Sequence, residues 1–118
     1  MWTLCHYGCP DDLDLLSPNF VRRFVRFVRF VREVSQYIAD HSNAELLYSP
    51  INEISFICWA VCHSDLMYPY AVRGKGRDYE LKRQLVRAFI EAIDALWVVD
   101  PRTRIVHVEP IIHVIAPT

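Results

Sequence analysis

The sequence predicts an α/β fold in which three short strands alternate with two long helices, in the order β-α-β-α-β. Two stretches, residues 18–40 and 79–99, repeat apolar side chains at the spacing of an amphipathic helix. Short apolar segments precede, separate and follow them, and the middle segment lacks the alternation of a strand with one solvated face. Together these observations indicate a parallel sheet with right-handed crossovers.

The first strand is expected at Trp2–His6, and the turn residues of 7–12 end it. Ser17 and Pro18 predict a helix start, because a hydroxyl can cap a helix and proline fits its first position. This helix should run to about Asp40. Its buried face is expected to consist of Phe20, Phe24, Phe27, Val31, Val34 and Ile38. A helix lying on a membrane surface is the alternative, because arginines cover the opposite face.

The second strand is expected at Leu46–Ile51, with Pro50 near its end because proline cannot donate to a sheet. Residues 54–77 are interpreted as a long connection rich in aromatic side chains. The second helix should span Tyr79–Val99, and the third strand Ile105–Glu109. The buried stripe of the second helix is expected to consist of Leu81, Leu85, Phe89, Ala92, Ile93 and Leu96.

The amino-acid composition argues against some classes of binding partner. The formal net charge is −1, from 13 basic and 14 acidic residues, so the charge favours neither nucleic acid nor an anionic membrane as a partner. No apolar run approaches the roughly eighteen residues of a membrane span. The N-terminus lacks the basic start of a signal peptide, and the chain has four cysteines. We therefore expect a cytoplasmic protein with reduced thiols.

The predicted sheet is incomplete as a domain. Two helices cannot cover both faces of a parallel sheet, and three strands leave two open edges. A TIM (β/α)₈ barrel needs roughly 250 residues, whereas the sequence has 118 residues and begins within a predicted strand. Residues 1–118 are therefore interpreted as one partial barrel segment, whose exposed edges could also drive self-association.

Two motifs lie at predicted strand ends, where barrel enzymes carry their sites. They are Thr3-Leu-Cys-His6-Tyr7, followed by Pro10, and Ser49-Pro-Ile-Asn52-Glu53. In order and separation they resemble the third and fourth strands of β-glucosidase-type (β/α)₈ glycoside hydrolases, that is, family 1 and its relatives in the same clan. In that family the first motif ends in a histidine that contacts the sugar, and the second in a sugar-binding amide and the catalytic acid/base.

The resemblance implies retaining hydrolysis of an O-glycosidic bond in a carbohydrate substrate, without a cofactor. It implies that Glu53 is the acid/base and that His6 and Asn52 bind the sugar. The family's nucleophile is a glutamate on the seventh strand, whereas the resemblance covers strands three to five, so this chain alone is expected to be inactive. Gly8 and Ile54 replace the family's usual acidic residue and proline, which indicates a divergent subgroup.

Other candidate residues have a structural and a functional interpretation. His107 and Glu109 share one face of the third strand and could line sugar subsites or form an ion pair. Trp59, with Tyr68 and Tyr70, could stack on a sugar or pack within the connection.

Metal and phosphate sites are not favoured. The spacing of Cys5, Cys9, Cys58, Cys62 and His63 is looser than that of paired zinc motifs, so no metal is predicted. Arg73–Arg77 is interpreted as a solvated loop and not as a phosphate site.

Two further functions stay open. One is a non-catalytic carbohydrate-binding or assembly protein with a small parallel α/β fold. The other is an unrelated hydrolase that binds a metal through Glu53, His107 and Glu109.

Overall fold

The fold is a three-stranded parallel sheet with three helices. A computed structural model describes residues 1–67, 76–111 and 115. In chain order the elements are β1 (Trp2–Thr3), α1 (Asn19–His41), β2 (Leu47–Ser49), α2 (Ile54–His63), α3 (Asp78–Val99) and β3 (Arg104–Ile105). The predicted α/β class and the three parallel strands are confirmed. The number of helices was predicted wrongly, because α2 lies in the segment interpreted as a connection.

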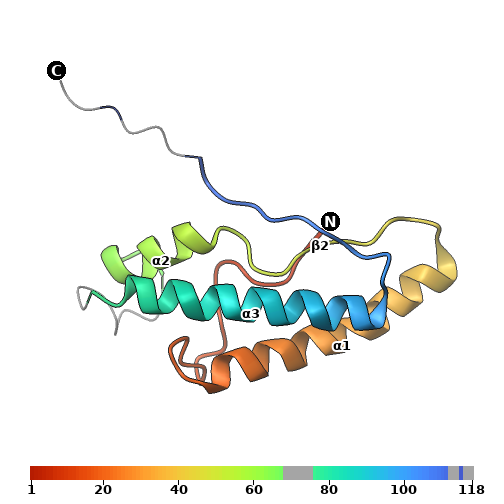
Figure 1. Ribbon diagram of the computed structural model, residues 1–118, viewed down its shortest axis with the longest axis horizontal. Coiled ribbons are helices and arrows are strands. Elements are labelled where there is room, and N and C mark those ends of the chain that lie inside the picture. The colour runs from red at the N-terminus through yellow and green to blue at the C-terminus, as the bar shows by residue number, and fades with distance from the viewer. Residues whose placement is uncertain (68–75, 112–114, 116–118) are drawn as a thin grey trace.

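The strands lie in the order β1-β2-β3, so β2 is central and each outer strand has one unpaired edge within the described residues. Backbone pairing continues beyond the short strands. The amide of Leu4 donates to the carbonyl of Ser49 at 3.0 Å, and the amide of Val106 donates to that of Tyr48 at 2.8 Å. In Figure 1, α1 and α3 lie together on one side of the strands and run in the same direction. Two consecutive βα units of a parallel sheet have this arrangement.

The buried face of α1 differs from the predicted one. Phe20, Phe24 and Val31 are buried as expected, but Phe27 and Val34 are 47% and 39% exposed. The residues that directly follow them, Val28 and Ser35, are buried instead, and so is Val21. The core-facing side of α1 is thus rotated relative to the predicted stripe, since α3 and the sheet together contact one side of the helix.

The buried stripe predicted for α3 is confirmed in part. Leu81, Leu85, Ala92 and Leu96 are buried, whereas Phe89 and Ile93 are only half-buried. Two further alanines, Ala88 and Ala95, complete the buried face. Small side chains at these positions let α3 lie close to its neighbours.

The helix α2 follows directly after β2. Ile54, Ile57, Cys58 and Val61 recur at helical spacing and are all buried. This spacing is a helix signal that the interpretation of the segment as a connection overlooked. The connection is therefore shorter than expected. Residues 68–75, which include Tyr68, Tyr70 and the start of the basic loop, lie outside the described residues.

No helix in the described ranges is long and apolar enough to cross a membrane.

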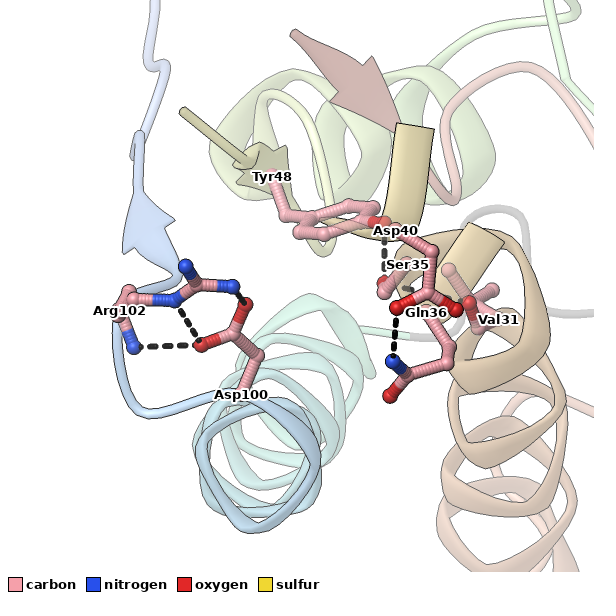
Figure 2. A network of polar contacts seen from close by, with 7 residues as sticks. All are labelled: Val31, Ser35, Gln36, Asp40, Tyr48, Asp100 and Arg102. Carbon is pink, nitrogen blue, oxygen red and sulfur yellow. Dashed lines mark hydrogen bonds and ion pairs between the residues drawn. The ribbon is translucent and has the colours of Figure 1, made fainter. Parts of the chain in front are cut away.

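A buried polar contact joins the sheet to α1. Figure 2 shows Tyr48 reaching from β2 to Ser35, with 2.7 Å between the two hydroxyl oxygens. Ser35 also donates to the carbonyl of Val31 at 3.2 Å. The side chains of both Tyr48 and Ser35 are almost completely buried, so this contact fixes the position of β2 along α1. In the same view, Arg102 pairs with Asp100 in the turn between α3 and β3.

The cost of breaking this contact should depend on which partner is removed. Tyr48→Phe leaves Ser35 bonded to Val31, so it should lower the free energy of unfolding by only about 0.5–1.5 kcal/mol. Ser35→Ala leaves the Tyr48 hydroxyl buried without this partner and should cost about 1–3 kcal/mol. Urea unfolding measures both. The double variant should cost clearly less than the sum, and strict additivity would contradict the contact.

Candidate functional site

The carboxyl ends of β1 and β2 bring together three of the predicted site residues. The Nδ1 atom of His6 lies 3.2 Å from the main-chain oxygen of Asn52, and the Asn52 side-chain nitrogen lies 3.5 Å from each ring nitrogen. The Nε2 atom of His6 lies 4.0 Å from a carboxylate oxygen of Glu53. The side chains of His6 and Glu53 are 20% and 28% exposed, so the group is partly covered and still open to a ligand.

Backbone hydrogen bonds to both outer segments of the sheet hold this group. The amide of Asn52 donates to the carbonyl of Cys5, and the amide of Glu53 donates to that of Val108, both at 2.9 Å. Two consecutive amides therefore bond to segments on opposite sides of β2. The positions of Asn52 and Glu53 are therefore set by backbone from the segments that follow β1 and β3.

Glu53 has a left-handed backbone conformation, with φ 55° and ψ 59°. For a residue with a side chain, this conformation costs roughly 1–2 kcal/mol. The two backbone hydrogen bonds of Glu53, to Val108 and from the amide of Ile57, hold it there. Local strain of this kind is concentrated at functional sites, where it fixes the direction of a side chain.

The carboxylate of Glu53 does not cap the helix that it precedes. It occupies the N-cap position of α2 but makes no side-chain capping hydrogen bond. The capping is done by Glu109, whose two carboxylate oxygens lie 3.1 and 3.2 Å from the amide nitrogen of Ser55. Because Glu109 satisfies this helix amide, the structural explanation of Glu53 as a cap is removed, and its carboxylate points into the group with His6.

His107 and Glu109 lie together, as the sequence predicted, with 3.6 Å between His107 Nε2 and Glu109 Oε1. The ring of His107 packs edge-on against Phe89, with ring centres 4.9 Å apart. The contact of Glu109 with α2 supports the structural interpretation of this pair. Their role in binding sugar stays a prediction.

Aromatic rings extend the site along α2. His6 and Tyr7 have ring centres 3.9 Å apart, and Phe56 lies 6.3 Å from His6. Phe56 also lies 5.8 Å from Trp59, which is 49% exposed. The sequence predicted Trp59 as a stacking residue but missed Phe56 as its link to His6. Helical spacing from residue 53 onward is the signal that could have found it.

Sequence reasoning also missed the contact between Lys82 and Ser55. The ammonium of Lys82 donates to the Ser55 hydroxyl at 3.0 Å. This contact joins α3 to the first turn of α2, and no local pattern in the sequence indicates it.

The surroundings of the cysteines favour the protonated thiol over the thiolate. Burial, with a smaller effect from neighbouring Cys62, raises the pKa of Cys58 to about 12. Burial likewise raises the pKa of Cys5 to about 11, with Cys9 adding to the shift. All four cysteines are free. Over the part of the chain that the structure describes, no three His, Cys, Asp or Glu side chains are placed to hold a metal ion, so neither metal alternative gains support.

Comparisons of the chain with protein-family models, with curated proteins and with solved structures find no match. The functional argument therefore depends on the geometry at the strand ends.

Removing the Cβ atom at position 53 should stabilise the fold. Glycine adopts the left-handed conformation without strain, so Glu53→Gly should be more stable than Glu53→Ala by about 1 kcal/mol. At most positions glycine is instead less stable than alanine by roughly 0.5–1 kcal/mol, so the sign of the difference is diagnostic. Urea unfolding of the two variants measures it. Equal stability, or greater stability of the alanine variant, would contradict a strained Glu53.

Alkaline unfolding should depend on Cys58. The thiol has a pKa of 9.0 when unperturbed and about 12 in the folded chain, so between these values the unfolded state loses the proton first. Stability should therefore fall as the pH rises above 9, by about 1.4 kcal/mol per pH unit for this one group. In Cys58→Ala the slope should be smaller by that amount, although the variant is less stable at neutral pH. Identical slopes of unfolding free energy against pH would contradict a buried, neutral thiol.

Proposed function

We propose that the chain is a segment of a β-glucosidase-like (β/α)₈ glycoside hydrolase and that Glu53 is the acid/base for hydrolysis of an O-glycosidic bond. The observation that carries the proposal is the meeting of His6, Asn52 and Glu53 at the carboxyl end of a parallel sheet. The motifs are far apart in the sequence, and β1 and β2 bring them together. Barrel enzymes place their catalytic residues at this end of the strands.

In the proposed reaction the protonated carboxyl of Glu53 donates its proton to the glycosidic oxygen as the bond to the leaving group breaks. The resulting carboxylate then takes a proton from the water that releases the sugar. The backbone constraint at Glu53 supports this role, because a proton donor must be held within hydrogen-bond reach of one oxygen. Asn52 and His6 offer polar side-chain atoms for sugar hydroxyls beside it.

The architecture also supports a larger barrel. Within the described residues, β1 and β3 each have an unpaired edge, and both long helices lie on one side of the sheet. A retaining glycosidase needs a second carboxylate about 5 Å from the first. Glu109 is engaged with α2, so the proposal places the nucleophile on a strand outside residues 1–118. Residues 1–118 alone should then show no turnover.

A non-catalytic carbohydrate-binding function is the alternative, favoured by the aromatic row from His6 through Phe56 to Trp59. Aromatic faces stack on the apolar faces of sugar rings without any need for a proton donor. The two functions differ in what they require of Glu53. Binding by stacking alone should survive Glu53→Gln and be lost in Trp59→Ala, whereas catalysis should be lost in Glu53→Gln.

A hybrid enzyme tests the catalytic role. Residues 1–118 would replace strands three to five, with their helices, in an active β-glucosidase-type barrel. Glu53→Gln in this hybrid should lower kcat/KM for an alkyl glucoside by about 10²–10⁴-fold, because the alkoxide leaving group needs the proton. For a dinitrophenyl glucoside the same variant should lower kcat/KM much less, because this leaving group departs without protonation.

The control is Glu45→Gln, which changes an exposed carboxylate before the start of β2, at the opposite end of the strand from the site, and should leave the hydrolysis of both substrates unaffected. Equal losses on both substrates in Glu53→Gln would contradict the acid/base role. So would robust glucosidase turnover by the purified chain of 118 residues, because it would require a nucleophile within the chain.

A further inference from the structure

A stripe of exposed apolar residues runs along α1. The side chains of Phe27, Phe30, Val34 and Tyr37 are 47%, 67%, 39% and 65% exposed. Their spacing of three, four and three residues is that of the a and d positions of a heptad repeat. We call these four residues the α1 seam. Side chains at this spacing on a helix form a nearly straight line, suited to packing against a second helix.

The α1 seam lies on the side of α1 away from α3. Towards α3, Val25 and Arg29 line a hollow of about 430 Å³ together with Ala95 and Val98. On the other side, Phe27 lines a hollow of about 280 Å³ between α1 and the residues that follow β1. Buried Phe20 and Phe24 line the same hollow, so the seam continues the core outward onto a flank that the described residues leave uncovered.

We propose that this flank binds a second copy of the chain, with the two α1 helices antiparallel about a two-fold axis. A two-fold interface requires a surface that is complementary to itself. The spacing of three, four and three residues is the same from either end of the seam. An antiparallel pair therefore places Phe27 of one copy against Tyr37 of the other. It also sets Phe30 against Val34, and each of these contacts occurs twice.

Charges beside the seam favour the antiparallel direction. Arg26, Glu33 and Asp40 follow one another at intervals of seven residues and lie along one flank of the seam. In an antiparallel pair these flanks face each other, which places Arg26 of each copy beside Asp40 of the other. The one like-charge contact on this flank is between Glu33 of one copy and Glu33 of the other, at the two-fold axis. In a parallel pair this flank would face Phe24 and Val31, which are buried in the core.

The exposed side of α3 is a less suitable partner for the α1 seam. It carries apolar Val86 and Ile90, but Arg83 and Arg87 lie beside them around the same hollow. Packing this side against α1 of a second copy would bring these arginines towards Arg26. Like charges brought together in this way disfavour association. The inference concerns residues 1–118 as a chain of their own and does not rest on the proposed enzymatic function.

Sedimentation velocity over a wide concentration series tests the pairing. The chain should show a reversible monomer–dimer equilibrium. Phe30→Glu should abolish the dimer and keep the circular dichroism spectrum, because Phe30 is 67% exposed and does not support the core. The matched control is Ile90→Glu, a 54% exposed apolar position on α3, which should leave the dimer unchanged.

Charge reversal tests the direction of the helices. Arg26→Asp and Asp40→Arg should each weaken dimerisation about tenfold, since each converts two attractive pairs into repulsive ones. The double variant R26D/D40R should restore the wild-type affinity, because the opposite charges then meet again with their signs exchanged. A chain that stays monomeric throughout, a dimer lost in Ile90→Glu, or a double variant no tighter than the single ones would each overturn the proposal.

Discussion

The turn at Asn52 and Glu53 is the constraint on which the rest of the structure depends. Three segments meet there, because the amide of Asn52 bonds to Cys5 and the amide of Glu53 bonds to Val108. These bonds extend the sheet beyond strands of only two or three residues. The left-handed conformation of Glu53 then reverses the chain into α2, whose apolar face closes over the core. Sheet, helix and candidate site are therefore parts of one arrangement of backbone hydrogen bonds.

The chemistry of this turn is divided between two glutamates. A residue at the N-cap position usually uses its side chain to accept from the helix amides. Here the distant Glu109 does so, and Glu53 keeps a strained backbone and a carboxylate directed towards His6. Glycine at position 53 would fit the backbone better, so stability alone does not explain a glutamate there. A need for the carboxylate would explain it, and this is the physical argument for the proposal that Glu53 is the acid/base, while Glu109 caps α2.

Much of this fold could be predicted from the sequence, and the failures have physical reasons. The succession of strands along the chain and the approximate bounds of α1 and α3 follow from periodicity, and the meeting of His6 with Asn52 follows from parallel strands. The helix α2 was missed because its apolar run was interpreted as a connection. The buried face of α1 was misplaced because two apolar stripes, one facing the core and one forming the α1 seam, overlap in the sequence. The conformation of Glu53 could not be predicted, because tertiary hydrogen bonds and not its own preference hold it.

The surroundings of Glu53 show what more a catalytic site needs. A carboxylic acid acts as a proton donor most effectively where water is excluded and each charge is met by a fixed dipole. In the described residues, backbone from the segments after β1 and β3 supports the turn, but the side chain of Glu53 is still 28% exposed. In the proposed barrel, further strands would pair with the edges of β1 and β3 that have no partner among the described residues, bring a second carboxylate and shield this group from solvent. A second copy joined through the α1 seam would cover the flank of α1 and leave the strand ends open. Association of two copies through the α1 seam therefore brings no second carboxylate to the site. It would also occupy the flank of α1 beside β1, where a preceding helix of the proposed barrel would pack.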